Sequence, residues 1–395
     1  MQKAIIIIPT YNEAGNLTRT LKKLNQVFKN INAWQMQVLV VDDNSPDGTA
    51  QVVKKLQKEY SFLKLLLNKK KNGLGAAYLK GMDQAFNQLE ADLVFEFDAD
   101  LSHDPHKIPE MLKRIDQGSD LVLGSRYIKG GSIPENWGLH RKFLSIFGNL
   151  FIRTIMMDYS IHDWTTGYRA IKKEVYQAVV KELEFERFFG YTFQIGFLHK
   201  ALRKNFKISE VAFAFKDREI GKSKIGPEYI KNTLLYIMKV RIQEILAMRV
   251  FKFAVVGSVG ALVQLLSLQL WRLFFPFQLA FFAAIETAVV SNFILSNLWT
   301  FADRKLKFKE IPLSFIKFNL SSGGSIAIQQ LVAIIGETTL GLQNIFIIPI
   351  INYPFDTGTL FAIVGILIGM FWNYFAYNAF IWKKNKKTKI KKLKK

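Results

Sequence analysis

The chain of 395 residues contains no cysteine, which excludes disulfide bonds and thiolate chemistry. It has only five histidines, and none are spaced like zinc ligands, so we expect no structural zinc site. We also expect no cleavable signal sequence, because the first apolar run, Ala4–Pro9, is short and leads into a polar motif.

Acidic residues are in the minority, with 32 against 54 basic residues and a formal net charge of +22. Such a balance suits nucleic acid, an anionic membrane surface or phosphorylated substrates. From Phe251 to Trp382 long apolar stretches dominate, which favours a lipid bilayer over nucleic acid as the partner. The run Lys383–Lys395 is then typical of a basic tail beside a membrane, or of a disordered solubilising tail.

Short β-rich runs alternate with helical patterns in the first part of the chain. The expected strands are Ala4–Ile8, Gln37–Val41, Leu63–Leu67, Leu93–Phe97 and Leu121–Leu123. The expected helices between them are Asn16–Phe28, Thr49–Glu59, Gly75–Leu89 and Pro105–Gln117. This alternation predicts an α/β domain with a mainly parallel sheet.

Polar clusters follow three of these strands, at Thr10–Glu13, Asp42–Asp47 and Asp98–His103. Ligands of open α/β sheets bind beyond the carboxyl ends of the strands, so we expect a binding site there. Carboxylates at neighbouring strand ends provide acceptors for ribose hydroxyls and a base edge, although Asp and Asn are also common turn formers.

Asp98 and Asp100 lie two residues apart directly after a buried strand. Two such carboxylates can share a hard cation that also binds a diphosphate. Mg²⁺ or Mn²⁺ at this position would act as a Lewis acid and neutralise charge on a departing nucleoside diphosphate. In isolation the Asp-x-Asp pattern also occurs in solvated turns, but its position after a strand favours a metal site.

Two amphipathic stretches follow, at Leu139–Met157 and Tyr229–Met248. Each places apolar side chains at helical spacing with basic residues interspersed. This pattern is typical of helices that lie in a membrane interface, and also of ordinary surface helices in a globular domain. Their proximity to the long apolar stretches favours the interface.

Four apolar segments are long enough to cross a bilayer. They are Phe251–Leu273, Leu279–Phe301, Phe315–Ile335 and Thr359–Trp382. The expected loops Phe275–Gln278 and Gly336–Gly358 contain no Lys or Arg, whereas Ala302–Glu310 contains four. The positive-inside rule therefore predicts a multi-pass protein of the cell membrane with its N-terminal domain and C-terminus in the cytoplasm.

Polar residues also occur within these segments, and Glu286 is acidic. An acidic residue at membrane depth suggests a functional site, whereas hydrogen bonding between helices is the simpler explanation. A homo-oligomer formed through the spans is compatible with this pattern.

Several motifs together resemble glycosyltransferase family 2, and more closely the dolichyl (polyprenyl) phosphate mannosyltransferases. The matching strings are Pro9–Glu13, Asp42–Thr49, Asn72–Gly75, Asp98–His103, Gly124–Tyr127, Trp137…Arg141, Asp163–Arg169, Gly190–Gln194 and Asp217…Lys224. The apolar half resembles the GtrA-like membrane family through Lys252–Gly257 and Asn292…Phe301. The first resemblance covers residues 1–228.

The resemblance implies a GT-A fold, which is Rossmann-like with a mainly parallel sheet, joined to an α-helical membrane domain of four spans. It implies that the donor is bound by Pro9, Tyr11, Glu13, Val41, Asp42, Asp43, Asp98, Ala99, Asp100, Arg126, Arg218 and Lys224. It implies metal ligands at Asp98, Asp100 and Ser102, and contacts to the lipid phosphate from Arg126, Arg141 and Ser145. It implies that the catalytic residues are Asp100, Arg126 and Arg218. Relatives carry an acidic residue where this chain has Gly196.

The implied reaction is transfer of mannose from GDP-mannose to a dolichyl or polyprenyl phosphate, for protein or cell-surface glycosylation. A lipid phosphate is already anionic, so it attacks without a strong general base, and we expect inversion to a β-linked product. A UDP-glucose enzyme acting on the same lipids and a translocator of lipid-linked sugars remain alternatives. A processive polysaccharide synthase is disfavoured, because the chain has no Gln-x-x-Arg-Trp string.

The expected organisation has four parts. Residues 1–228 form the glycosyltransferase domain, including the interface helix 139–157. Residues 229–248 form a second interface helix, residues 249–383 the membrane domain, and residues 384–395 a basic cytoplasmic tail.

Overall fold

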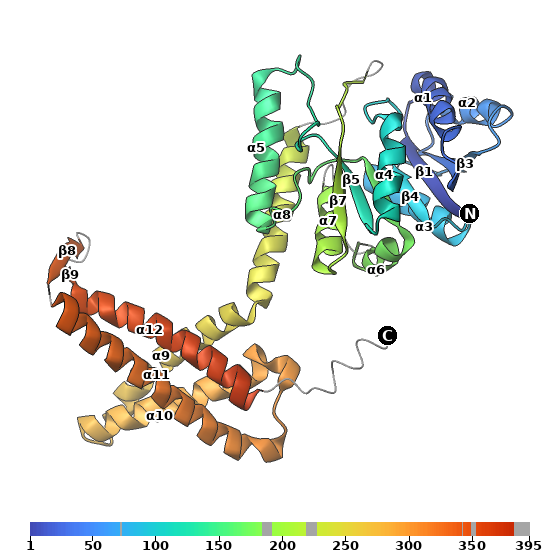
Figure 1. Ribbon diagram of the computed structural model, residues 1–395. Coiled ribbons are helices and arrows are strands. Elements are labelled where there is room, and N and C mark those ends of the chain that lie inside the picture. Colours follow the sequence, from blue (N-terminus) through green and yellow to red (C-terminus); the bar gives the residue numbers. More distant parts are fainter. Residues whose placement is uncertain (72, 184–191, 219–226, 342, 349–352, 383–395) are drawn as a thin grey trace. The chain divides into compact units, whose positions relative to one another are not determined.

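The computed structural model describes residues 1–71, 73–183, 192–218, 227–341, 343–348 and 353–382 (Figure 1). The chain divides into two compact units, Met1–Arg241 and Ile242–Lys395. The first unit contains the α/β sheet and the second contains the apolar helices. The predicted basic tail and Lys224 lie outside the described residues.

A seven-stranded sheet forms the centre of the first unit. Its strands are β1 (Gln2–Thr10), β2 (Trp34–Asp42), β3 (Leu63–Leu67), β4 (Leu93–Glu96), β5 (Leu121–Ser125), β6 (Arg169–Lys172) and β7 (Ile208–Ala212). The order across the sheet is β3-β2-β1-β4-β6-β5-β7, and β6 runs antiparallel to β4 and β5 while the other pairs are parallel. The prediction of a Rossmann-like, mainly parallel sheet is confirmed.

Helices cover both faces of this sheet. They are α1 (Ala14–Phe28), α2 (Thr49–Leu56), α3 (Leu74–Asn87), the 3-10 turn η1 (Pro105–Lys107), α4 (Ile108–Asp116), α5 (Leu139–Met156), α6 (Lys173–Leu183), α7 (Thr192–Arg203) and α8 (Pro227–Ala247). On β1, Ile5 and Ile7 belong to the core that contains α3, while Ala4, Ile6 and Ile8 belong to the core that contains α1. Successive strand side chains point to opposite faces, so burial on both faces explains the unbroken apolar run of β1.

The strand order reverses beside β1, because β2 and β3 lie on one side of it and β4 on the other. Pro9 of β1 is the register partner of Val41 of β2, and Thr10 is the partner of Asp42. β1 also pairs parallel with β4. The loops after β1, β2 and β4 therefore leave the same edge of the sheet, at the switch point where open α/β sheets bind their ligands.

Strands β6 and β7 were not predicted from the sequence. β6 has only four residues and begins with Arg169, so it lacks an apolar pattern of its own. β7 alternates weakly, with Val211 as its one fully buried side chain. Both depend on pairing with strands distant in sequence, which local patterns do not report.

The close packing of α3 on the sheet requires a glycine at position 81. A Cβ atom at Gly81 would lie 2.7 Å from the side chain of Ile7 and 3.0 Å from that of Val41. We expect Gly81→Ala to lower the free energy of unfolding by about 1–3 kcal/mol, the usual cost of overpacking a core. A Cβ at Gly148 in α5 meets nothing within 4 Å, so Gly148→Ala should raise stability by about 0.5–1 kcal/mol. Thermal unfolding of both variants checks this, and equal destabilisation would contradict the packing.

The second unit consists of long helices. They are α9 (Arg249–Trp271), α10 (Phe277–Leu295), α11 (Ile311–Leu340) and α12 (Thr357–Ala376), with short 3-10 turns η3 (Ala302–Arg304) and η4 (Phe308–Glu310). Within the described residues, α9 alone is both long and apolar enough to cross a membrane. Helices occur in all four regions predicted as spans.

Several boundaries in this unit differ from the prediction. The expected loop Gly336–Gly358 is partly helical, since α11 extends to Leu340. Its remainder includes an antiparallel pair, β8 (Asn344–Ile348) and β9 (Tyr353–Asp356), in which the isoleucine-rich run favours a strand. The predicted spans ending at Phe301 and Trp382 are α-helical only to Leu295 and Ala376.

A π-helical turn follows each of α10 and α12. These turns are η2 (Ser296–Thr300) and η5 (Tyr377–Ile381). In each, the N–H after the turn donates to the carbonyl five residues earlier, from Phe301 at 2.8 Å and from Trp382 at 2.9 Å. The two rings stack on each other, with centroids 4.4 Å apart and planes at 6°. The unit is therefore built from two similar helical hairpins, α9–α10 and α11–α12.

Two asparagines occupy equivalent places in these turns. Asn297 accepts hydrogen bonds from the Leu306 N–H (2.9 Å) and the Trp382 indole N–H (3.1 Å). Asn378 accepts from the Arg304 guanidinium (2.5 Å). Each asparagine thus binds a donor supplied by the other hairpin or by the segment between the hairpins, which joins the two halves.

Candidate active site

The two acidic residues after β4 lie on a firmly held loop. Asp98 accepts a hydrogen bond from the Tyr78 hydroxyl of α3 (3.3 Å), and Asp100 accepts one from the N–H of Ser102 (3.0 Å). Leu101 has a φ of 62°, in the left-handed region that costs a side-chain-bearing residue about 1–3 kcal/mol. A fold that retains such strain at a sheet edge is holding two carboxylates in a defined position.

The predicted donor contact Ala99 and the neighbouring His103 complete this loop. The Ala99 carbonyl accepts from the Thr20 hydroxyl of α1 (2.6 Å). His103 Nδ1 accepts from the Asp98 N–H (3.0 Å), so the ring proton is on Nε2, 3.7 Å from the Asp98 carboxylate. Burial lowers the pKa of His103, and its ring stacks on Tyr168 at 4.9 Å. His103 is therefore a neutral support for the loop.

The two acidic residues at the end of β2, Asp42 and Asp43, have different surroundings. Asp42 is fully buried and accepts from the Thr10 hydroxyl (3.0 Å) and from the N–H and hydroxyl of Ser45 (3.0 and 2.5 Å). Asp43 accepts from the Asn68 side-chain amide (2.7 Å). Asp42 therefore holds the loop in shape from within.

Tyr11 and Glu13, after β1, lie at the same sheet edge. The ammonium of Lys71 lies 4.0 Å from the centre of the Tyr11 ring. Glu13 accepts from the Asn16 side chain at 2.7 Å. The strand-end loops thus bring an aromatic ring, a cation and carboxylates together, which suits a nucleotide with its base and ribose hydroxyls.

Arg126, after β5, is fixed by a buried acid. Its Nε and Nη2 donate to the two carboxylate oxygens of Asp163 at 2.7 Å each, and Nη2 also donates to the Thr165 hydroxyl at 2.8 Å. The Asp163 side chain is completely buried and that of Arg126 is 10% exposed. This bidentate pair sets the plane of the guanidinium. The sequence contained Asp163 only as part of a matching string, without a role.

Arg218, after β7, is brought to the loop after β4. Its Nη2 lies 3.2 Å from Oδ2 of Asp100, whose side chain is 6% exposed. The residue expected to contact phosphate and a carboxylate expected to hold metal are therefore neighbours. Lys224, expected in the same region, lies outside the described residues.

Arg141 and Ser145, the other predicted contacts of the lipid phosphate, both lie on α5. Arg141 pairs with Asp217 (3.1 Å) and lies over the ring of Trp137 at 3.8 Å. The Ser145 hydroxyl shares a hydrogen bond with the Tyr127 hydroxyl (2.5 Å). Tyr127 directly follows Arg126 in the chain, so α5 is tied to the end of β5 at this point.

A buried arginine that sequence reasoning did not single out braces the site. Arg169 is inaccessible and donates to the carbonyls of Thr166 (3.0 Å), Gln194 (2.8 Å) and Trp164 (3.4 Å). It lies 3.8 Å from Glu96, and burial raises the pKa of the Glu96 carboxyl to about 7 against the opposing effect of Arg169. The one sign of this contact in the local sequence is a basic residue, Arg169, at the start of the core strand β6.

The described residues contain no cluster of three or more His, Asp or Glu side chains that would hold a metal ion alone. The donor set after β4 is nevertheless of the right chemistry for a hard cation. Asp98 and Asp100 supply carboxylate oxygens, and Mg²⁺ sites commonly use one or two carboxylates with water and substrate phosphates completing the shell. Ser102 is buried, and its N–H is bonded to Asp100.

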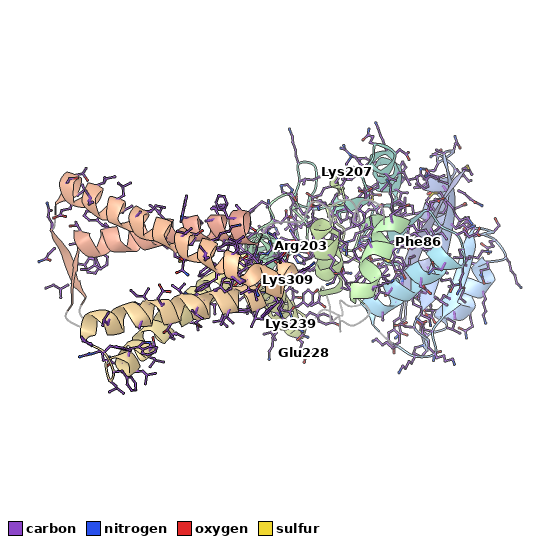
Figure 2. All side chains as sticks on the ribbon, turned by 90° about the horizontal axis from the view of Figure 1, so that it is seen from below. Phe86, Arg203, Lys207, Glu228, Lys239 and Lys309 are labelled. Carbon is purple, nitrogen blue, oxygen red and sulfur yellow. The ribbon has the colours of Figure 1, made fainter. Side chains whose placement is uncertain are left out.

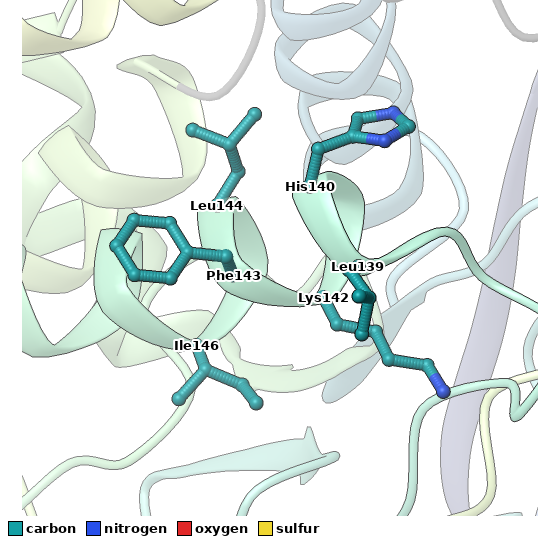
Figure 3. A pocket seen from close by; sticks show the side chains of 6 residues that line it. All are labelled: Leu139, His140, Lys142, Phe143, Leu144 and Ile146. Atoms are coloured by element: carbon teal, nitrogen blue, oxygen red, sulfur yellow. The ribbon is translucent and has the colours of Figure 1, made fainter.

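One side of α5 exposes apolar side chains. They include Phe143 (57% exposed), Phe147 (50%) and Leu150 (44%). An open pocket lies along the first turns of the helix, where Leu139, Phe143, Leu144 and Ile146 line it together with His140 and Lys142 (Figure 3).

Helix α8 carries charged side chains such as Glu228 and Lys239 (Figure 2), and it also exposes apolar ones such as Leu235 and Ile242. Exposed apolar faces of this kind mark surfaces that meet a membrane or another molecule.

The mainly parallel sheet of the first unit is GT-A-like. The family model for "Glycosyl transferase family 2" matches residues 5–180, and that for the "GtrA/DPMS, transmembrane domain" matches residues 252–382. The chain belongs to glycosyltransferase family 2 and carries a GtrA/DPMS transmembrane domain, which makes it a membrane protein.

Three relatives with assigned activities are similar to this chain. The dolichol-phosphate mannosyltransferase of Pyrococcus furiosus is 33% identical over 325 residues, 81% of this chain and 86% of the relative. The polyprenol monophosphomannose synthase of Mycolicibacterium smegmatis is 36% identical over 60% of this chain and 86% of its own length. The undecaprenyl-phosphate mannosyltransferase of Micrococcus luteus is 36% identical over 57% and 88%. The match to the Pyrococcus furiosus relative extends into the membrane domain, because it covers more residues of the chain than the first unit contains.

Proposed function

We propose that this enzyme transfers mannose from GDP-mannose to the phosphate of a dolichyl or polyprenyl lipid. The observation that carries the proposal is the approach of Arg218 to Asp100 at the sheet edge, 3.2 Å apart, beside the loops after β1 and β2. This sheet edge is where α/β sheets bind nucleotides, which supports a role for Arg218 in binding phosphate and for Asp100 in binding a metal ion. The three mannosyltransferase relatives support mannose and a lipid phosphate as the substrates.

The donor is expected to lie across the loops after β1, β2 and β4. Pro9, Tyr11, Glu13, Val41 and Asp43 are proposed to contact the nucleoside, and Asp42 keeps their loop in shape. Asp98, Ala99, Asp100, Arg126, Arg218 and Lys224 are proposed to surround the diphosphate and sugar. The supporting role of Asp42 rests on its burial and on its hydrogen bonds with Thr10 and Ser45.

Asp98 and Asp100 are proposed to hold the divalent cation, Mg²⁺ or Mn²⁺, with Ser102 nearby. When bound, this ion would neutralise charge on the leaving nucleoside diphosphate. The Arg218 guanidinium balances the charge of Asp100, and it is near enough to contact the diphosphate that shares this site. Cationic side chains therefore supply the electrostatic stabilisation that the departing phosphate needs.

The acceptor phosphate is proposed to contact Arg126, Arg141 and Ser145. Its oxygen attacks the anomeric carbon while the bond to the diphosphate breaks, so the new glycosidic bond forms on the opposite face of the sugar. The phosphate is anionic near neutral pH and needs no proton removed, so the protein's contribution is position and charge. This single displacement inverts the configuration and gives a β-linked lipid phosphate mannose.

The exposed apolar sides of α5 and α8 are proposed to lie in the membrane interface, where a lipid phosphate is found. We assign residues 1–228 to the catalytic domain, residues 229–248 to an interface helix, residues 249–383 to four membrane spans, and residues 384–395 to a basic tail. The basic segment Ala302–Glu310 supports a cytoplasmic location for the catalytic domain and the C-terminus.

A donor screen tests the proposal. Purified full-length protein in detergent with polyprenyl phosphate is given radiolabelled GDP-mannose, UDP-glucose or GDP-glucose, and label in the organic-extractable product is counted. We expect mannose transfer to exceed transfer from the other donors, with a mild-acid-labile product. Transfer from the UDP sugar alone would overturn the assignment of mannose, and no transfer to the lipid from any donor would overturn the acceptor.

A further inference from the structure

Asn149, in the middle of α5, is 4% exposed and has its polar atoms bonded to two separate parts of the catalytic unit. Its Oδ1 accepts from the backbone N–H of Trp164 at 2.9 Å. Its Nδ2 donates to the Ser145 carbonyl one turn earlier (3.0 Å) and toward the Thr165 hydroxyl (3.4 Å). The fixed backbone donor of Trp164 identifies which amide atom is the oxygen. Asn149 therefore connects α5 to the segment that follows buried Asp163.

The same segment fixes Arg126. The Thr165 hydroxyl that faces Asn149 also accepts from Nη2 of Arg126 at 2.8 Å, and Asp163 binds the guanidinium through both oxygens. A chain of three hydrogen-bonded side chains thus runs from Asn149 through Thr165 to Arg126. Because these side chains are hydrogen-bonded to one another, a displacement of one is expected to displace its neighbours.

A second set of hydrogen bonds joins α5 to the end of β5. Tyr127, next to Arg126, shares a hydrogen bond with the Ser145 hydroxyl (2.5 Å) and donates toward the Ser145 carbonyl (3.2 Å). That carbonyl is also the acceptor of Asn149. Ser145 is therefore bonded to Tyr127, which follows Arg126 in the chain, and to Asn149, which also contacts a partner of Arg126.

We propose that Asn149 is a positioning residue that keeps Ser145 on α5 in register with Arg126, so that both meet the same acceptor phosphate. The inference rests on the proposed function, since it gives a task to the lipid-phosphate contacts assigned there. It explains why a polar side chain is buried on a helix whose opposite side is apolar and exposed. Displacing an acceptor-binding helix by a fraction of an ångström affects acceptor binding and alignment, while the nucleotide loops after β1 and β2 stay in place.

The test uses the full-length enzyme with Asn149→Leu, which keeps the branched shape with bulkier methyl groups and removes the polar groups, and Tyr127→Phe, which removes one hydroxyl. For both we expect the KM for polyprenyl phosphate to rise by about tenfold or more, the effect of losing about 1.4 kcal/mol of acceptor binding. The affinity for GDP-mannose, measured by calorimetry, is expected to change by less than about twofold, since a tenfold change requires about 1.4 kcal/mol at that site.

Thr154→Val is the matched control. Thr154 lies on the same helix and donates to its own helical carbonyl at Leu150 (2.9 Å), so this variant should keep wild-type kinetics. If the wild type is active and both folded variants keep the wild-type KM for polyprenyl phosphate, the inference is wrong. The proposed function would then still stand. A fall in donor affinity as large as the rise in acceptor KM would also overturn the inference, because that result indicates a general structural role.

If Asn149→Leu does not fold, Tyr127→Phe decides by the same criterion. Wild-type enzyme that transfers no sugar to the lipid would instead overturn the proposed function, and the inference with it.

Discussion

Replacing Asp100 with asparagine is expected to lower kcat/KM for sugar transfer by about 10²–10³-fold or more, the usual effect of removing one preorganised electrostatic contact. The amide keeps an oxygen for the N–H of Ser102, so the loop after β4 should stay folded. It loses the negative charge that balances Arg218 and that a divalent cation requires. Initial rates of label transfer from GDP-mannose to polyprenyl phosphate measure the effect.

Asp104→Asn provides the control in the same loop. Asp104 accepts from the His106 N–H at 3.0 Å and caps the turn η1. Asparagine is an equally good capping residue, so stability and activity should stay near wild type. If Asp100→Asn retained wild-type turnover with its fold intact, the carboxylate after β4 would have no part in the reaction.

Replacing Arg126 with alanine is expected to abolish transfer and also to destabilise the protein. Asp163 is completely buried, and removal of its guanidinium partner leaves an unpaired charge at a cost of about 3–5 kcal/mol. The double variant Arg126→Ala/Asp163→Asn removes this charge, so its melting temperature should recover toward wild type. Its transfer rate should stay as low as that of the single variant, because the phosphate contact is still missing.

The double variant separates the two roles of Arg126. Thermal unfolding followed by circular dichroism measures stability, and label transfer measures activity, on the same purified samples. Recovery of both in the double variant would mean that Arg126 supports the fold and does not take part in the chemistry.

The sheet edge of the candidate site was predictable from local patterns. Buried apolar runs give the strands, and the polar residues that follow Thr10, Asp42 and Glu96 fall where those strands end. Because the carboxyl ends of parallel strands lie at the same edge of a sheet, the three loops are expected to lie close together. The structure places Asp98 and Asp100 on that edge as the sequence suggested.

The partners of the arginines were not predictable in the same way. Arg126 and Asp163 are distant in sequence, and nothing in the composition of either segment indicates that they pair. Arg169 resembles a surface residue until β6 is found to lie between β4 and β5, where its charge is buried beside Glu96. Antiparallel insertion of a short strand is a property of tertiary packing, which local periodicity does not encode.

The similarity of the two hairpins in the membrane domain also escaped sequence reasoning. The two halves share scattered residues, such as Asn297 and Asn378, but the strands β8 and β9 lengthen the second half and disturb the spacing. The common feature is a backbone turn with a bond to the carbonyl five residues back. Such a turn has no simple hydrophobic period, so it is visible only in the structure.

Metal dependence of lipid mannosylation tests the central claim most directly. Full-length enzyme stripped with a chelator is assayed for transfer from GDP-mannose to polyprenyl phosphate, before and after Mg²⁺ or Mn²⁺ is restored, with Asp100→Asn in parallel. We expect transfer to stop on chelation, to return with the ion in the wild type, and to stay absent in the variant. Undiminished transfer by the stripped wild type would contradict the assignment of Asp98 and Asp100 as the metal site.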